Sequence, residues 1–302
     1  MCLSKKEELW DKSLKRLSSA IERNTLKSGD LNTSIPSLNL YRRNAPTEPL
    51  PCIYSLSLGL VVQGNKQILF GDKIINYGSG ELLITTIDVP VITHVTKASN
   101  HEPFLALVID IDYKLLIQIM NEIKKPQLQK KLAFESVSVY KSEQVLLDVI
   151  CRLVEVLDEP LLIKQLAPLF LQEIHIRLIS GVYGNMLQNL IIKETPEQQI
   201  LSSIIWIKQN FTKTINIDEI AENANMSPSS FRKHFRNITG TSPLQYQKQL
   251  RIQESRQLML NKGYNSNEVS NLVGYQSVSQ FNREYKRILG MPPYRDIQQL
   301  KI

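Results

Sequence analysis

Two clusters of polar and basic residues near the C-terminus have the chemistry and the spacing needed to bind DNA. The clusters are Ser229, Arg232, Lys233 and Arg236, and then Ser279, Asn282, Arg283 and Lys286. Guanidinium and amide groups hydrogen-bond to base edges in the major groove, and basic groups bind phosphate. Within each cluster the residues recur at helical spacing, so each cluster occupies one face of a helix. The pattern favours two DNA-reading helices.

The opposite faces of these helices are apolar and repeat one another. Phe231, Phe235 and Ile238 lie at i, i+4 and i+7, and the same spacing returns 50 residues later. The second set is Phe281, Tyr285 and Ile288. Such stripes face a hydrophobic core. The sequence therefore contains an internal repeat, in which each copy has one buried and one basic face.

Local signals place the ends of both helices. Ser227 and Ser277 are good N-caps, and Gln280 provides the partner that a capping box at Ser277 needs. Gly240 and Gly290 follow the last apolar residues and predict C-terminal ends. Both helices are therefore expected to be about three turns long.

A shorter helical segment and a tight turn precede each helix, in IDEIAENANM and NEVSNLVGY. At an offset of 49 residues, Asn225 pairs with Gly274, and both residue types tolerate the left-handed backbone of a sharp turn. A helix, a short turn and a second helix with an exposed basic face is typical of the helix-turn-helix motif.

The alternative is that both are ordinary surface helices of a bundle, which also have charged outer faces. Charge distribution favours DNA binding. Residues 196–302 contain 14 Lys and Arg against 8 Asp and Glu, a net +6, whereas residues 1–195 contain 22 against 21, a net +1. Nearly all of the basic excess lies in the repeat region.

Residues 243–261 between the repeats predict one long helix. Ser242 is an N-cap, Pro243 suits the first turn, and Gly263 follows the end. At ~1.5 Å per residue this helix spans about 28 Å. One turn of B-DNA is ~34 Å, so the helix could hold two reading helices in successive major grooves.

Residues 197–299 resemble the DNA-binding domain of AraC/XylS-type transcription regulators. The resemblance rests on IDEIAENANMSPSSFRKHFRNITGTSP, on QYQKQLRIQESRQLML, and on VGYQSVSQFNREYKRILGMPPYRD. It places the base-reading positions at Ser229, Arg232, Lys233, Val278, Ser279, Asn282 and Arg283. Val278 replaces a residue that is often polar, and it could contact a thymine methyl group but not hydrogen-bond a base. Arg236 and Lys286 lie further along the helices, where phosphate is the expected partner.

The chain is long enough for two domains, which we place at residues 1–195 and 196–302. Residues 4–24 predict an amphipathic helix with Trp10, Leu14, Leu17 and Ile21 on one stripe. Short β-prone runs separated by turn signals occupy residues 53–111 and predict an antiparallel sheet or small barrel, and helical stretches follow it.

Residues 41–190 resemble the cupin-like N-terminal domain of one branch of AraC-type regulators. The resemblance implies a barrel that binds a small-molecule effector, with helices after it that make the protein a homodimer. The predicted fold class is therefore α+β, with an N-terminal cupin-like antiparallel β-barrel with flanking helices and an all-α C-terminal domain with tandem helix-turn-helix motifs. The segment IIKETPE joins the two domains.

The remaining composition predicts a cytoplasmic protein, and the family resemblance implies a bacterial one; we expect no cofactor. The N-terminus lacks the apolar core of a signal peptide, and no run of eighteen apolar residues could span a membrane. Cys2, Cys52 and Cys151 are scattered, as in a reduced protein. Double-stranded operator or promoter DNA is the expected partner, and RNA polymerase is a second possible partner.

Two other functions compete with regulation by an effector. A cupin enzyme needs clustered metal ligands, but His94, His101, His175 and His234 form no H-x-H pair, so we expect no metal site. The chain also lacks G-x-S-x-G, a Gly-rich phosphate loop and C-x-x-C, so we expect no catalytic residues. An architectural DNA-binding protein would need only charge, whereas these helices present polar groups suited to base edges.

Overall fold

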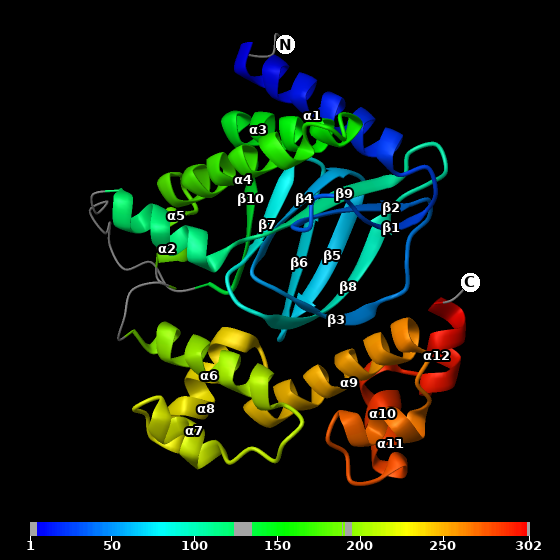
Figure 1. Ribbon diagram of the computed structural model, residues 1–302, viewed down its shortest axis with the longest axis vertical. Helices are drawn as coiled ribbons and strands as arrows, with labels where there is room; N and C mark the ends of the chain where they lie inside the picture. The colour runs from blue at the N-terminus through cyan, green and yellow to red at the C-terminus, as the bar shows by residue number, and fades with distance from the viewer. Residues whose placement is uncertain (1–4, 124–134, 189, 191–194, 301–302) are drawn as a thin grey trace.

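The computed structural model describes residues 5–123, 135–188, 190 and 195–300. An N-terminal domain of sheets and helices lies above a C-terminal domain of helices alone (Figure 1). This arrangement confirms the predicted α+β class. The joining segment IIKETPE lies partly outside the described residues.

The strands of the N-terminal domain form two antiparallel sheets and not one closed barrel. The six-stranded sheet has the order β1-β2-β9-β4-β7-β10, and the four-stranded sheet has the order β3-β8-β5-β6. The strands are β1 (Gly29–Asn32), β2 (Leu38–Arg43), β3 (Leu50–Tyr54), β4 (Ser57–Gln63), β5 (Asn65–Phe70), β6 (Lys73–Gly78), β7 (Glu81–Thr85), β8 (Val89–Lys97), β9 (Phe104–Asp110) and β10 (Val137–Lys141). No ladder joins the two sheets among the residues that the structure describes.

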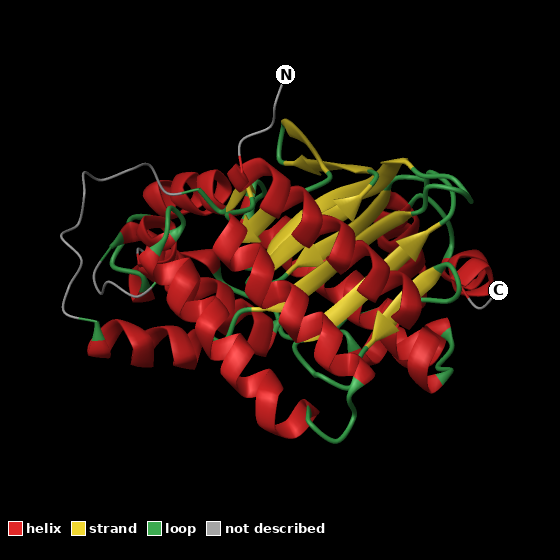
Figure 2. Cartoon of the chain, turned by 90° about the horizontal axis from the view of Figure 1, so that it is seen from above, coloured by secondary structure: helices red, strands yellow, loops and turns green. Residues whose placement is uncertain are grey.

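Central strands of the six-stranded sheet are buried on both faces. On one face, Leu58 and Leu60 of β4 are inaccessible to solvent, as are their β9 partners Ile109 and Leu107. On the other face, Val61 is opposite Ala106, and both are buried. One face packs toward the other sheet, and helices cover the opposite face (Figure 2). Near-continuous apolar runs such as LGLVV suit strands enclosed in this way.

The covering helices are α1 (Lys5–Asn24), α3 (Gln144–Glu155) and α4 (Ile163–Ser180). In α1, the predicted stripe is confirmed, since Leu17 and Ile21 are fully buried and Trp10 and Leu14 are half-buried. Trp10 also donates from Nε1 to the Ser142 carbonyl at 2.9 Å. The rest of this domain is α2 (Tyr113–Glu122), the 3₁₀ turn Val156–Asp158 and α5 (Gly184–Gln188).

Seven helices of the C-terminal domain are described. They are α6 (Pro196–Asn210), α7 (Ile217–Asn223), α8 (Pro228–Thr239), α9 (Pro243–Lys262), α10 (Ser266–Leu272), α11 (Val278–Leu289) and α12 (Pro293–Leu300). The predicted connecting helix is α9, which runs beneath β3 from the group α6–α8 to the group α10–α12 (Figure 1). We call α6–α8 the first unit and α10–α12 the second unit.

Candidate nucleic-acid interface and effector cavity

The two reading helices begin and end as their caps predict. Ser227 Oγ accepts from the Ser230 amide at 3.3 Å, and Ser277 Oγ accepts from the Gln280 amide at 3.2 Å. Gly240 and Gly290 close the helices with left-handed φ values of 73° and 80°. The predicted capping box at Ser277 is only half formed.

A complete capping box lies at the start of α10 instead. Asn265 Oδ1 accepts from the Glu268 amide, and the Glu268 carboxylate accepts from the Asn265 amide at 2.8 Å. This box fixes the shorter helix that precedes the second reading helix.

The turns before α8 and α11 have the same geometry. Asn225 and Gly274 adopt left-handed φ values of 52° and 87°, as their residue types predict. The next residue in each turn donates its amide five residues back at 2.9 Å, from Met226 to Ala221 and from Tyr275 to Ser270. Both units are therefore helix-turn-helix motifs built on one plan.

Aromatic side chains hold each reading helix against its own unit. Phe231, Phe235, Phe281 and Tyr285 are fully buried, which confirms these parts of the predicted stripes. Ile238 is also buried, but Ile288 is only half-buried and Leu289 enters the core of the second unit. Ile288 still packs against that core, so its place on the predicted stripe is confirmed, and Leu289 lies on the other edge of the same stripe.

The polar faces opposite these stripes are open to solvent. Most of the expected reading residues are exposed, and Val278 is half-buried at the start of α11. The exposed ones are Ser229, Arg232, Lys233, Arg236, Ser279, Asn282, Arg283 and Lys286. Arg232 forms an ion pair with Asp218 at 3.3 Å, but both side chains are more than half exposed, so the pair holds Arg232 weakly.

A buried ion pair anchors the second reading helix to its surroundings. Arg256 on α9 forms a bidentate pair with Asp296 on α12, with both N–O distances 2.8 Å and both side chains at most 9% exposed. The Tyr285 hydroxyl donates to the same carboxylate at 2.6 Å. Burial and the neighbouring Asp296 carboxylate raise the pKa of Tyr285, so its proton remains available for this bond.

A cavity of about 140 Å³ lies between the two sheets. Tyr41 from the six-stranded sheet and Lys66, Tyr77 and Thr93 from the four-stranded sheet are among its lining residues. The Lys66 ammonium lies 5.3 Å from the centre of the Tyr54 ring and forms no ion pair with any described residue. Burial raises the pKa of Tyr41 to about 12, so this phenol is neutral near pH 7.

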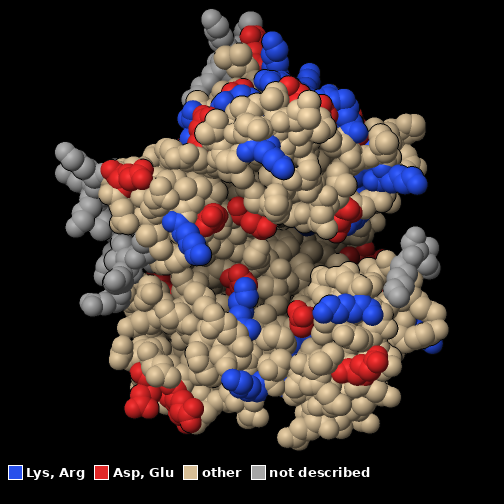
Figure 3. All heavy atoms as spheres, in the orientation of Figure 1, with Lys and Arg blue, Asp and Glu red and all other residues tan. Residues whose placement is uncertain are grey.

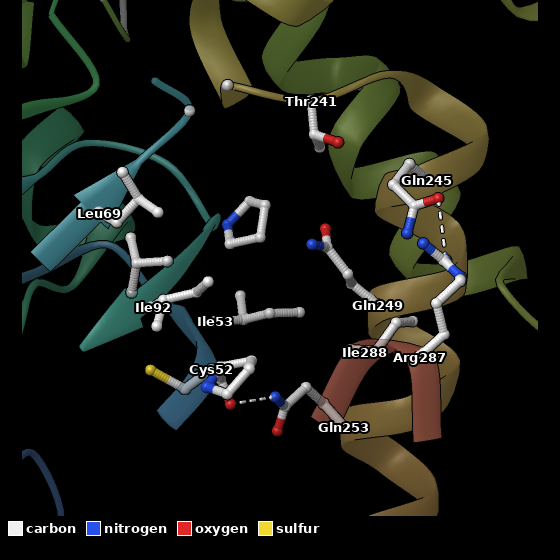
Figure 4. Close-up of a pocket in the computed structure, with 15 residues that line it drawn as sticks. Cys52, Ile53, Leu69, Ile92, Thr241, Gln245, Gln249, Gln253, Arg287 and Ile288 are labelled. Carbon is white, nitrogen blue, oxygen red and sulfur yellow. Dashed lines mark hydrogen bonds between the residues drawn. The ribbon is translucent and has the colours of Figure 1, made fainter. Parts of the chain in front are cut away.

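The two domains enclose a second cavity, the interdomain cleft, of about 260 Å³. In Figure 4, Gln245, Gln249 and Gln253 of α9 face Ile53 and Ile92 of the four-stranded sheet, with Arg287 and Ile288 of α11 beside them. Gln253 donates to the Pro51 carbonyl at 2.9 Å, which ties α9 to the edge strand β3. Gln249 Oε1 is buried and accepts no hydrogen bond from the described residues.

Further contacts connect the N-terminal domain with α6, with α9 and with the turn between α8 and α9. Asp88 pairs with Lys208 of α6, and the Asp88 carbonyl accepts from the Tyr246 hydroxyl at 3.3 Å. The backbones of Gly71 and Gly240 touch, since a Cβ on Gly240 would lie 2.9 Å from the Gly71 nitrogen. Figure 3 shows a surface hollowed at this junction, with basic and acidic side chains interspersed.

The histidines lie apart from one another. His94 is on β8, His101 precedes β9, His175 is buried in α4 and His234 is half-buried in α8. In the described ranges, no group of three His, Cys, Asp or Glu side chains could hold a metal ion. None of the helices with described residues is long and apolar enough to cross a membrane.

Models of two known families match most of the chain. Residues 34–186 match the N-terminus of AraC-type transcriptional regulators, and residues 220–298 match a helix-turn-helix domain. The chain belongs to the AraC-type transcriptional regulators. The two matches lie in the N-terminal and the C-terminal part of this regulator.

Sequence relatives resemble part of this AraC-type regulator. It is 30% identical over 112 residues to YobQ of Bacillus subtilis, an uncharacterised helix-turn-helix regulator, which covers 36% of this chain and 46% of YobQ. It is 27% identical over 126 residues to LumQ of Photobacterium leiognathi, a probable transcriptional regulator, which covers 39% of this chain and 51% of LumQ. The chain thus matches about half the length of these curated relatives.

Similarity in fold extends over nearly the whole chain. A crystal structure of an apo ToxT variant from Vibrio cholerae superposes with a TM-score of 0.61 at 12% identity, covering 86% of this chain and 97% of ToxT. Wild-type ToxT bound to an unsaturated fatty acid gives the same TM-score and identity and covers 90% of this chain and 95% of ToxT. At this identity the likeness establishes the fold alone.

Sequence reasoning did not identify the polar residues on α9 that connect the two units. Arg251, Gln247 and Arg256 all bond to atoms far away in the sequence. The available signal was the position of these side chains within a helix that must contact both units. It gave no indication of their partners.

Proposed function

We propose that this AraC-type regulator binds a specific DNA site with both units at once and thereby controls transcription in a bacterial cell. The observation that carries the proposal is the repeated geometry of the turns at Asn225 and Gly274, which presents α8 and α11 with equivalent exposed faces. In helix-turn-helix proteins the second helix of each motif enters the major groove. A single chain would then contact two successive grooves.

Individual roles within these faces follow from side-chain chemistry. We assign Arg232 and Arg283 to guanine edges, because a guanidinium fork can bond to O6 and N7 together. The other proposed base contacts are Ser229, Lys233, Val278, Ser279 and Asn282. Arg236 and Lys286 lie nearer the helix C-termini, where we assign them to phosphate. The weak pair between Arg232 and Asp218 costs little to break on binding.

The effector in this proposal is a small organic molecule that occupies the cavity between the sheets. Much of the cavity lining is apolar, and Lys66 is a cation there that forms no ion pair with the described residues, although Glu48 also lines the cavity. A ligand with an acidic or carbonyl oxygen would complement this ammonium. The ToxT structure with a bound unsaturated fatty acid supports a ligand role for this fold. Replacing Lys66 with Met should weaken such a ligand about tenfold or more.

We propose that the N-terminal domain binds its effector without converting it. Supporting this, the described residues hold no cluster of metal ligands, and the sequence contains none of the nucleophile or phosphate-loop motifs considered above. Turnover of a bound ligand by the purified protein, or a stoichiometric metal needed for ligand binding, would contradict the proposal.

A homodimer through α4 is the further part of the proposal. Three exposed apolar residues recur every seven residues, from the N-cap of α4 along the helix. They are Leu162, Leu169 and Ile176, which are 41%, 59% and 39% exposed. Apolar side chains at heptad spacing form the seam of paired helices. A second copy of α4 would cover this stripe.

The test is selection of duplexes from a random library by the full chain and by residues 196–302. Both should enrich the same bipartite sequence, because both units and α9 lie within the fragment. Measured affinity should be at least 10³-fold higher for the selected site than for random DNA at about 150 mM salt. Equal binding to all duplexes would instead favour an architectural protein, and no binding would refute the proposal.

A further inference from the structure

Arg251 of α9 contacts both helix-turn-helix units at once. Its Nε donates to the Phe211 carbonyl at 2.7 Å, and its Nη2 donates to the carbonyls of Thr212 and Lys213 at 3.2 and 3.0 Å. These three carbonyls belong to the loop between α6 and α7 in the first unit. Its Nη1 donates to the Gly274 carbonyl at 2.8 Å, in the turn of the second unit.

Neighbouring side chains hold Arg251 in this position. The guanidinium lies 5.4 Å from the centre of the Tyr275 ring, which is within range of a cation–π interaction. One turn earlier on α9, the buried Gln247 donates from Nε2 to the carbonyls of Phe211 and Lys213 at 2.8 and 2.6 Å. The loop of the first unit is thus bonded to α9 at two levels.

The two units also touch directly at this point. A Cβ on Gly274 would lie 1.9 Å from the Thr212 carbonyl oxygen, so the two backbones are in contact. Phe211 of the first unit packs against the hydrophobic core of the second unit. The units are therefore in one fixed arrangement, and α9 is more than a tether.

We propose that Arg251 is a positioning residue that sets the spacing of the two DNA half-sites this regulator accepts. This inference rests on the proposed function, because it presupposes that α8 and α11 each read one half-site. One base pair moves the groove by ~3.4 Å and turns it by roughly 34°. Two rigidly held helices cannot follow that change, whereas loosely held helices can. The fork of Arg251 spans both units and no other described side chain bonds to carbonyls of both.

The experiment compares spacing preference between variants of the full chain. Arg251→Met keeps the aliphatic stem but removes all four bonds. Lys262→Met is the matched control, since Lys262 is exposed on the same helix and its loss removes the same charge. Each protein is titrated against the selected site, against each half-site alone, and against sites with one base pair inserted or deleted between the half-sites.

The wild type and Lys262→Met should lose ~30-fold or more in affinity when the spacer changes by one base pair. Rigid linkage raises the affinity ~10²–10⁴-fold, but only while both half-sites are bound at the same time. Arg251→Met should bind the best site about tenfold more weakly and lose less than about threefold on the altered spacers. Its affinity for isolated half-sites should stay within about twofold of wild type. Only a positioning role predicts this combination.

Gln247→Leu provides a second variant that loosens the same loop, and its spacer profile should flatten in the same direction. Circular dichroism and thermal unfolding identify any variant that fails to fold. The spacer profile is then interpreted for the variant that remains folded. A wild-type spacer profile in the folded variant overturns the inference, as does an equal loss on half-sites and full sites. A wild-type chain that selects no site refutes the proposed function itself, and the inference with it.

Discussion

Removal of the Asp296 carboxylate should destabilise the second unit more than any other single polar change there. In Asp296→Leu, Arg256 would keep its charge inside the domain with neither of its two 2.8 Å bonds, and Tyr285 would lose its acceptor. Both partners of the ion pair are at least 91% buried, so solvent cannot replace the lost contacts. Breaking such a pair from one side costs ~3–5 kcal/mol.

Hydrogen exchange measured by mass spectrometry can locate this loss in the full chain. A cost of ~3–5 kcal/mol corresponds to about 10²–10³-fold or more in the local opening constant, at ~1.4 kcal/mol per tenfold change. Amides of α11 and α12 should therefore exchange that much faster, while amides of α8 in the first unit should change little. Tyr285→Phe loses one hydrogen bond and should cost only ~1–2 kcal/mol.

The double variant Arg256→Met with Asp296→Leu distinguishes two causes of lost stability, the unpaired charge of Arg256 and the loss of packing. With both charges removed, most of the stability should return, because an apolar pair of similar volume often replaces a buried ion pair without cost. The reasoning is refuted if Asp296→Leu changes exchange in α11 by less than about fivefold. It is also refuted if the double variant is as unstable as the single one.

Three further predictions concern the reading faces, pH and assembly. Arg232→Ala and Arg283→Ala should each cost ~1–3 kcal/mol of binding free energy on the selected site and relax the preference at one base pair. Arg236→Ala should instead weaken binding to selected and random DNA alike. Titrations of both duplexes across a salt series will check these results. Burial lowers the pKa of His175 below its usual 6.5. The free energy of unfolding should therefore be highest above pH 6.5 and decrease below it, because the unfolded chain there takes up a proton that the native state excludes. Urea unfolding from pH 5 to 8 should show this slope, and His175→Gln should flatten it. Leu169→Glu should abolish the proposed homodimer and give a monomer in sedimentation experiments without unfolding the domain, because it places a charge in the proposed α4 seam.

The helical part of the fold could be predicted because its signals are local. A serine at Ser227 or Ser277 caps the amides directly beside it, and Asn225 or Gly274 needs only its own backbone to make the turn. Duplication strengthened the prediction, since the same pattern at an offset of about 50 residues is hard to obtain by chance. Helix boundaries and exposed faces were therefore predicted to within a residue or two.

Other features depend on partners that are distant in the sequence. Alternating apolar strands predict sheets, but they do not specify whether the sheets close into a barrel or form two layers, as the strand orders here show. The carbonyls bound by Arg251 lie between 23 and 40 residues away from it, and no local pattern marks them. The contribution of Ile288 to the interdomain cleft likewise depends on a domain that the helix itself does not encode.

A single layer of backbone separates the cavity between the sheets from the interdomain cleft. Leu50 and Thr93 are paired across β3 and β8 and line the cavity, and the next pair, Pro51 and Ile92, lines the cleft on the opposite face. Among the strands that the structure describes, β3 is an edge strand that pairs with β8 alone, and its Pro51 carbonyl accepts a hydrogen bond from Gln253 of α9. A ligand that displaces β3 therefore moves the acceptor that holds α9. Because α9 joins the two units, we expect β3 to transmit a ligand-driven movement from the cavity to the two proposed DNA-reading faces.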